Sequence, residues 1–175
     1  MNKMVNGKQC TVLWHVDDLK ISHIEGSANE SVLDGLNMRY GKETPLTVTR
    51  GDLHDYLGMT IDYSTKGKVM IGMEDYLEEM MVDLPEDLEG TATSPAANHL
   101  FTVNDNAEKL DSDKSEFFHS CTAKILFLCK RSRPDVQTPI ACLCTRVSEP
   151  DVDDLKKLRR VVRYLRGTKH MALTL

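Results

Sequence analysis

Two apolar runs near the N-terminus flank a pair of acidic residues. Residues 11–16 and 19–21 are rich in β-branched and aromatic side chains, which favour β-strands. Asp17 and Asp18 lie between the two runs, and aspartate favours tight turns. The pattern therefore predicts a β-hairpin that presents two aspartates at its tip.

The rest of the front half alternates between helical and strand patterns. Residues 27–41 have apolar side chains at helical spacing and end in glycine, which predicts a helix of about three to four turns. Strand patterns follow at residues 46–50, 54–63 and 68–73. A second, shorter helix is predicted at about residues 74–83.

The rear half has mainly helical patterns. Residues 85–111 are rich in Pro, Gly, Asn, Thr and acids, which predicts a linker that is long for a compact domain. Beyond it, apolar stripes predict a helix from residue 112, a second that starts at Pro134 and a third from about Asp151. Pro139 is expected to kink the second of these, because proline cannot donate the helical hydrogen bond.

These patterns together predict an α+β fold with two domains. An antiparallel sheet with packed helices would occupy residues 1–84, residues 85–111 would be a linker, and helices would fill residues 112–175. The final residues, 171–175, have the pattern of a further strand. A hydrophobic content of 41% is sufficient for such domains to bury a core.

Charge is distributed unevenly between the two halves. Residues 1–118 contain 10 Lys and Arg against 22 Asp and Glu, whereas residues 119–175 contain 12 against 5. An acidic front half can bind cations, and a basic rear half can bind a polyanion. The asymmetry predicts two surfaces with different partners.

Several classes of protein are disfavoured by the composition. No apolar run approaches the roughly 20 residues that a membrane helix needs, and the N-terminal residues lack the apolar region of a secretory signal. The five cysteines show no zinc-type spacing, which favours reduced thiols over disulfides or a metal site. We therefore expect an intracellular protein of the cytoplasm or nucleus that is neither secreted nor bound to a membrane.

The candidate chemistry lies in the Asp17-Asp18 pair. Two carboxylates at one hairpin tip suit Mg²⁺ or Mn²⁺, which are cations that prefer oxygen ligands. In phosphoryl transfer, two such metals activate the attacking hydroxyl and stabilise the leaving oxygen. The dipeptide by itself is a weak indication, since an exposed turn also accounts for two acids. Asp153-Asp154 in the same chain is explained by the negative charge that favours a helix N-terminus.

The predicted last helix carries a run of cations without an intervening acid. They are Lys156, Lys157, Arg159, Arg160, Arg163, Arg166 and Lys169. A solvated polar face is the usual meaning of such charges, and contact with nucleic-acid phosphates is the alternative. Such a track could extend to four cations that precede the helix, Lys124, Lys130, Arg131 and Arg133.

Several segments, taken in order, resemble the reverse transcriptase of Ty1/copia-type retrotransposons. The segment LWHVDDLKISH resembles the Tyr-x-Asp-Asp polymerase motif of this family. The segment HDYLGMTID resembles the YLGM-type strand of the same palm. Three further segments resemble, in order, the family's segments that join the polymerase to its RNase H. They are SPAANHLF, FHSCTAKILFLCKRSRPDVQTPIACLCTRV and DDLKKLRRVVRYLRGT. The ordered set covers nearly the whole chain and is far more specific than the aspartate pair alone.

The resemblance implies roles for individual residues. Asp17 and Asp18 would be two of the three catalytic carboxylates and would hold Mg²⁺ or Mn²⁺. His15, which stands where the family more often has tyrosine, and Val16 would contact the template-primer. The primer would be gripped by a strand with the residues Tyr56, Leu57, Gly58 and Met59. The cations of residues 156–166 would add phosphate contacts.

The resemblance also implies what surrounds this region. Residues 1–84 would be part of the palm, and residues 112–175 would be the thumb or connection region. The first catalytic aspartate and the fingers would lie upstream, and an RNase H domain downstream, in a polyprotein that also carries an integrase. The intact enzyme would act on an RNA or DNA template-primer and dNTPs. We therefore expect that this chain does not polymerise alone.

Three interpretations are open at this point. The chain is a fragment of an RNA-directed DNA polymerase, a non-catalytic remnant that binds nucleic acid through its basic helices, or the product of a truncated gene without a stable fold. A salt-dependent shift of an RNA–DNA hybrid would distinguish the second from the third. A cooperative melt would test the third.

Overall fold

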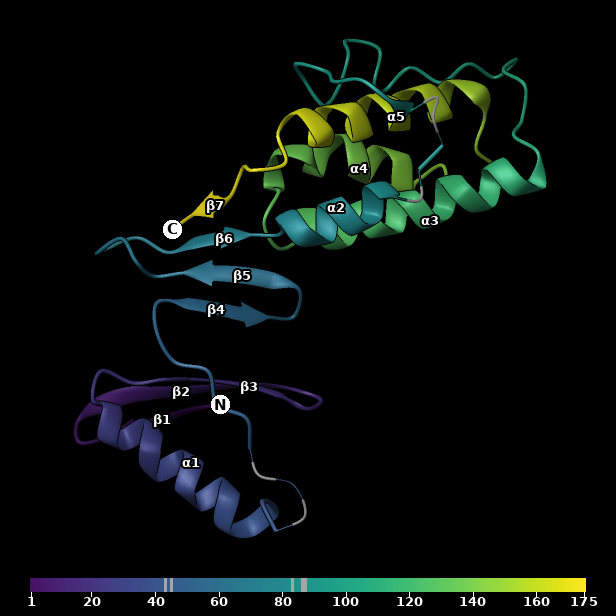
Figure 1. Ribbon diagram of the computed structural model, residues 1–175. Helices are drawn as coiled ribbons and strands as arrows, with labels where there is room; N and C mark the ends of the chain where they lie inside the picture. The colour runs from purple at the N-terminus through teal and green to yellow at the C-terminus, as the bar shows by residue number, and fades with distance from the viewer. Residues whose placement is uncertain (43, 45, 83, 86–87) are drawn as a thin grey trace. The chain divides into compact units, whose positions relative to one another are not determined.

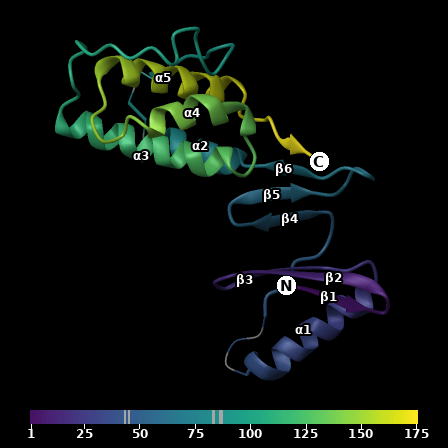
Figure 2. The same cartoon turned by 180° about the vertical axis from the view of Figure 1, so that it is seen from behind.

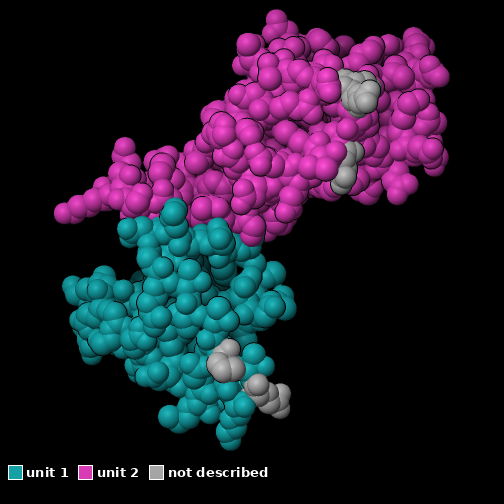
Figure 3. All heavy atoms as spheres, viewed as in Figure 1, with its two compact units in different colours: residues 1–57 teal, residues 58–175 magenta. Residues whose placement is uncertain are grey.

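The chain forms two compact units in a computed structural model (Figure 1), Met1–Leu57 and Gly58–Leu175, which Figure 3 shows in different colours. The structure describes residues 1–42, 44, 46–82, 84–85 and 88–175. Both units combine strands with helices, which confirms the predicted mixture of α structure and antiparallel β structure. Within the described ranges, no helix is both long and apolar enough to cross a membrane.

The first unit contains a three-stranded antiparallel sheet, with its strands in the order β1 (Asn2–Val5), β2 (Lys8–His15) and β3 (Asp18–Ser22). The predicted hairpin of β2 and β3 is confirmed, with His15 paired to Asp18. β1 was not predicted, although Asn6-Gly7 is a strong hairpin signal. Both residues have positive φ, 50° and 72°, as such a two-residue turn requires.

Helix α1 (Gly26–Tyr40) lies against this sheet (Figure 1) and confirms the first predicted helix. It ends at the expected glycine, where the N–H of Gly41 donates to the Asn37 carbonyl at 2.8 Å. Among the described residues of this unit, the fully buried apolar side chains are Cys10 and Ala28. The first unit therefore has a small core, and much of its apolar surface is only half-buried.

Of the predicted strands after α1, one is wrong and a second is interrupted. Residues 46–50 pair with no strand in the part of the chain that the structure describes, and the N–H of Leu46 donates to the Asn37 side chain instead. The predicted strand at 54–63 is divided into β4 (Leu53–Tyr56) and β5 (Met59–Asp62). The intervening Leu57 and Gly58 have φ of 54° and 73°, which is incompatible with a strand.

In the second unit, β5, β6 (Met70–Gly72) and β7 (Leu173–Thr174) form an antiparallel sheet in this order. Met70 pairs with Asp62 on one side and with Thr174 on the other. The predicted C-terminal strand is therefore confirmed, and it pairs with a strand about a hundred positions earlier in the sequence.

Helices form the rest of the second unit: α2 (Glu74–Val82), α3 (Ser112–Cys129), the 3₁₀-helix η2 (Pro134–Val136), α4 (Gln137–Cys144) and α5 (Val152–Gly167). Figure 2 shows α2 to α5 gathered into one bundle. Leu77, Phe118, Ile125, Ile140 and Leu158, which come from these four helices, are at most 1% exposed. The predicted helices are thus confirmed, and the predicted end of the second helix at residue 83 lies outside the described residues.

The predicted linker, residues 85–111, packs on the helices so far as it is described. Leu88 joins the core, Leu100 is buried, and the N–H of Ala92 donates to the Arg163 carbonyl at 3.3 Å. The boundary between compact units accordingly lies at residue 57 and not in this segment. Its composition correctly indicated little regular structure, but irregular structure can still make tertiary contacts. The assignment of palm and thumb stays a prediction.

Pro139 does not end a helix, since α4 (Gln137–Cys144) continues beyond it. Helix α4 begins at Gln137, so Pro139 lies in its first turn, where the N–H groups have no helical partner. The predicted start of the last helix is confirmed. The side chain of Asp151 accepts hydrogen bonds from the N–H groups of Asp153 and Asp154, both at 2.9 Å, as an N-cap does.

Candidate functional site

The turn between β2 and β3 places Asp17 at the tip of the hairpin. Val16 and Asp17 form a two-residue loop, and Asp18 is the first residue of β3. His15, Val16, Asp17 and Asp18 are all exposed. The two carboxylates therefore belong to adjacent residues at an exposed reversal of the chain, while their role as metal ligands stays a prediction.

Val16 has an unusual backbone conformation. Its φ is 52°, a region that a β-branched residue rarely adopts and that typically costs about 1–3 kcal/mol. The indole Nε1 of Trp14 donates to the Val16 carbonyl at 2.6 Å, which ties the turn to β2. Strain of this kind persists only where the surroundings fix it, and it clusters at functional sites.

Replacing Val16 with glycine is expected to stabilise the hairpin by about 1 kcal/mol, because glycine adopts positive φ without steric cost. Amide hydrogen exchange in β2 and β3 should slow by about fivefold. The matched control is Val12→Gly within β2, where glycine should speed the exchange. Faster exchange in Val16→Gly would show that the turn is not strained at this residue.

The donor atoms at this turn match Mg²⁺ or Mn²⁺ in kind but fall short in number. Carboxylate oxygens are the ligands that these cations take. Among the described residues, however, no group of three or more His, Cys, Asp or Glu side chains is positioned to hold a metal ion. Asp17 and Asp18 would therefore be joined by waters, by substrate phosphates or by ligands from outside the described residues.

The predicted primer-grip residues lie at the turn after β4. Tyr56 ends β4, Leu57 and Gly58 form the turn, and Met59 begins β5. Gly58 is exposed, and a Cβ added there would meet only the Met73 methyl at 3.9 Å, so positive φ rather than close packing requires glycine. The boundary between the units falls between Leu57 and Gly58, and the role of these residues as a grip stays a prediction.

The cations of α5 mostly bind the backbone of the same unit. Their acceptors are carbonyl oxygens of residues 88–102: Lys157 Nζ donates to Thr102 at 2.7 Å, Arg160 Nε to Ser94 at 3.2 Å, Arg163 Nε to Glu89 at 2.8 Å and Arg166 Nη1 to Leu88 at 2.9 Å. This segment has little regular structure, so its carbonyl groups need donors from elsewhere. Sequence reasoning missed this role. The sequence did contain a signal for this role. A long irregular segment, which needs hydrogen-bond donors, occurs in the same chain as an excess of long cationic side chains.

Exposure separates the predicted phosphate-binding residues of α5. Lys157 is buried, whereas Arg159, Arg160, Arg163 and Arg166 are half-buried. Lys156 is exposed and pairs with Asp153 at 2.8 Å. Lys156 is therefore the one of these six residues in the exposed class, and its ammonium group is paired with Asp153.

A basic and aromatic surface lies on α2 and α3. We call it the α3 patch, formed by Tyr76, Lys124, Phe127, Lys130 and Arg131. The Arg131 guanidinium carbon is 3.5 Å from the centre of the Phe127 ring, which is 5.2 Å from the centre of the Tyr76 ring. The Tyr76 hydroxyl donates to the Lys124 carbonyl at 3.2 Å, and burial raises the pKa of Tyr76. Lys124, Phe127 and Lys130 are exposed, so the patch offers positive charge beside an aromatic face.

Arg133, which the sequence grouped with these cations, is buried and only 1% exposed. Its Nε and Nη2 donate to the two carboxylate oxygens of Asp135 at 3.0 and 2.7 Å. Its Nη1 and Nη2 also donate to the Thr168 carbonyl at 2.9 Å and hydroxyl at 2.7 Å. Burial raises the pKa of Asp135, but the hydrogen bonds and charge of Arg133 outweigh it and hold this pKa below its usual range. The inclusion of Arg133 in a nucleic-acid track is wrong, because its guanidinium ties η2 to the end of α5.

The chain is similar to a protein assigned to a yeast transposon. It is 24% identical over 159 residues to a transposon Ty5-1 protein of Saccharomyces cerevisiae. The match covers 91% of this chain, and it spans about half (49%) of the relative's length. No family model and no solved structure matches. The similarity supports a relation to retrotransposon proteins and leaves the activity to be established.

Proposed function

We propose that the chain is a fragment of a Ty1/copia-type reverse transcriptase, an RNA-directed DNA polymerase. The observation that carries this proposal is the exposed Asp17-Asp18 pair at the hairpin reversal, with Asp17 in the two-residue loop and Asp18 at the start of β3. The similarity to a transposon protein and the order of motifs along the chain support it. Residues 1–84 would belong to the palm and residues 112–175 to the thumb or connection region.

In this proposal, Asp17 and Asp18 hold Mg²⁺ or Mn²⁺ in the intact enzyme. The bound cations would stabilise charge on the attacking and leaving oxygens during nucleotidyl transfer. The two aspartates contribute carboxylate oxygens at an exposed turn, and the conformation of Val16 fixes the course of the chain between β2 and β3. The resemblance implies a third catalytic carboxylate, and no group of three such side chains is found among the described residues, so this chain is not expected to polymerise by itself.

The remaining predicted site residues are proposed to bind the template-primer. His15 and Val16 would contact it near the primer end, and the segment from Tyr56 to Met59 would grip the primer strand. Lys156 and the α3 patch would contact phosphates, because Lys156, Lys124 and Lys130 are exposed. RNA or DNA template-primer and dNTPs would be the partners, and an integrase and an RNase H would be other parts of the polyprotein.

The proposal predicts that Mn²⁺ binds first at the hairpin tip. Because Mn²⁺ is paramagnetic, the amide NMR signals of residues 15–19 should broaden at lower Mn²⁺ concentrations than those near other acids. Replacing Asp17 and Asp18 together with asparagine should raise the concentration required by about tenfold, because the carboxylate ligands are lost. Asp153→Asn, in the other unit, is the control. Broadening that begins elsewhere, or that persists in the double variant, would refute the proposed metal role.

A nucleic-acid-binding remnant without catalysis is the second candidate, and the α3 patch favours it. Cations beside an aromatic face can hold phosphates and bases without any metal. Binding of an RNA–DNA hybrid by a chain that fails the Mn²⁺ experiment would select this candidate over the polymerase.

A further inference from the structure

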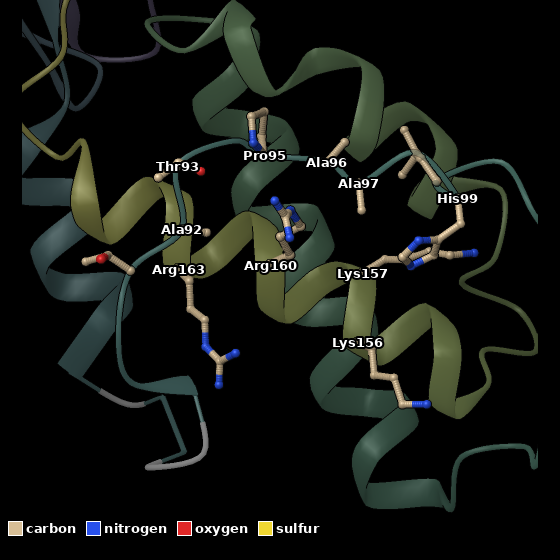
Figure 4. A pocket seen from close by; sticks show the side chains of 12 residues that line it. Ala92, Thr93, Pro95, Ala96, Ala97, His99, Lys156, Lys157, Arg160 and Arg163 are labelled. Atoms are coloured by element: carbon tan, nitrogen blue, oxygen red, sulfur yellow. The ribbon is translucent and has the colours of Figure 1, made fainter.

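A cavity of about 490 Å³ lies between α5 and residues 91–100 (Figure 4). Its volume falls in the range of about 300–1,000 Å³ that small-molecule sites occupy. Four cations line it from α5: Lys156, Lys157, Arg160 and Arg163. His99 lines it from the opposite segment, and no acid is among the described residues of its lining. A cavity of this composition attracts anions.

Arg160 is oriented by Ser94 on the opposite wall. Figure 4 shows its side chain extending from α5 toward the segment that carries Thr93 and Pro95. Its Nε donates to the Ser94 carbonyl at 3.2 Å, and its Nη2 donates to the Ser94 hydroxyl at 2.9 Å. The same hydroxyl donates to the Ala96 carbonyl at 3.0 Å, which fixes Ser94 in turn. The N–H groups of Nη1 have no partner among the described residues, so a held guanidinium keeps donors for a ligand.

The charge of Arg160 is also uncompensated. The oxygens of Ser94 accept its hydrogen bonds but carry no net charge. Lys156 and Lys157 have acidic partners, Asp153 at 2.8 Å and Asp154 at 3.7 Å, whereas Arg160 forms no ion pair within the described ranges. An anion in the cavity would meet one unpaired guanidinium with further cations beside it. The planar fork of a guanidinium matches the oxygens of a phosphate.

We propose that this cavity binds a terminal phosphate or polyphosphate group, with Arg160 as the main donor. The same chemistry occurs in free polyphosphate compounds and at the 5′ end of a nucleic acid. This inference does not rest on a polymerase function, since Asp17 and Asp18 belong to the other unit.

Calorimetric titration of the whole chain with tripolyphosphate, without divalent cations and at constant ionic strength, tests the site. We expect one saturable site, which Arg160→Gln should weaken by about tenfold, because a charge-assisted hydrogen-bonding group is lost. Lys66→Gln removes an exposed cation outside the cavity and should bind as the wild type does. Asp17→Asn should also leave this affinity unchanged, which separates failure here from failure of the polymerase proposal.

Competition with pentanucleotides identifies the source of the phosphate. Displacement of tripolyphosphate by a 5′-phosphorylated but not by a 5′-hydroxyl pentanucleotide would support the site and assign it to a nucleic-acid end. Displacement by neither would support the site and assign it to a free polyphosphate. Equal displacement by both would overturn the proposal.

A second variant keeps the test decisive if Arg160→Gln loses its helical circular dichroism. The side chain of Lys156 is exposed, so Lys156→Glu should fold, and its new charge should repel the ligand and weaken binding. Absence of binding at millimolar tripolyphosphate would overturn the proposal. Equal binding by the wild type and every folded cavity variant would overturn it too.

Discussion

Replacing Arg133 with alanine is expected to lower the free energy of unfolding of the second unit by about 2–4 kcal/mol, because a buried side chain and its hydrogen bonds are lost. Arg133 is almost completely buried and donates four hydrogen bonds, two to Asp135 and two to Thr168. Its removal leaves the Asp135 carboxylate, whose side chain is 27% exposed, without a cation and the Thr168 carbonyl without a donor from Arg133. Urea denaturation followed by circular dichroism measures the change, provided that the transition is cooperative.

Lys130→Ala is the matched control for this prediction. Lys130 is exposed, so its loss should change the free energy of unfolding by less than about 0.5 kcal/mol.

The same unfolding measurement at acidic pH provides a second control. Because the pKa of Asp135 is lowered in the folded chain, the pair contributes stability at neutral pH, and this contribution is lost as the pH falls through the folded pKa.

The difference between the wild type and Arg133→Ala should therefore narrow below about pH 4. A difference of less than about 1 kcal/mol at neutral pH would be too small for the loss of a buried side chain with four hydrogen bonds. If the difference in free energy of unfolding between the two proteins grew as the pH fell, the stabilising ion pair between Arg133 and Asp135 would be contradicted.

Replacing Lys124, Lys130 and Arg131 together with glutamine is expected to weaken binding of an RNA–DNA hybrid by about a hundredfold at roughly 0.1 M salt. Each phosphate contact that the variant loses reduces the number of counterions released when the protein binds the hybrid. The slope of log affinity against log salt should therefore become shallower by about 0.9 for each cation removed. Fluorescence anisotropy of a labelled hybrid over a series of salt concentrations measures both quantities.

A second triple variant controls for net charge. Lys3, Lys8 and Lys42 are exposed cations of the first unit, and their replacement by glutamine removes the same charge. This variant should change the affinity by less than about threefold if the α3 patch makes the specific contacts. Equal losses in the two triple variants would mean that the hybrid responds to overall charge, and the patch would then have no special role.

Short-range patterns in the chain were sufficient for most of the helices and for the hairpin. Alternating β-branched and aromatic residues around Asp17 and Asp18 predicted β2, β3 and the reversal between them. Helical periodicity predicted α1, α2, α3 and α5, since apolar spacing along a helix directly reflects which face is buried. The local signals failed where two successive residues, Leu57 and Gly58, adopted positive φ inside an apparently continuous strand.

Contacts between residues distant in the sequence determined the packing of the irregular segment, the burial of Arg133 and the cavity beside Arg160. Arg160 and Ser94 are 66 positions apart, and Arg166 and Leu88 are 78 apart, yet these pairs hold the irregular segment on α5. The sequence displays the charge of a cation but not its surroundings, so Arg133 and the exposed Lys130 looked alike until packing buried one of them. The cavity beside Arg160 has the same origin, because a cavity exists only between segments that long-range packing brings together.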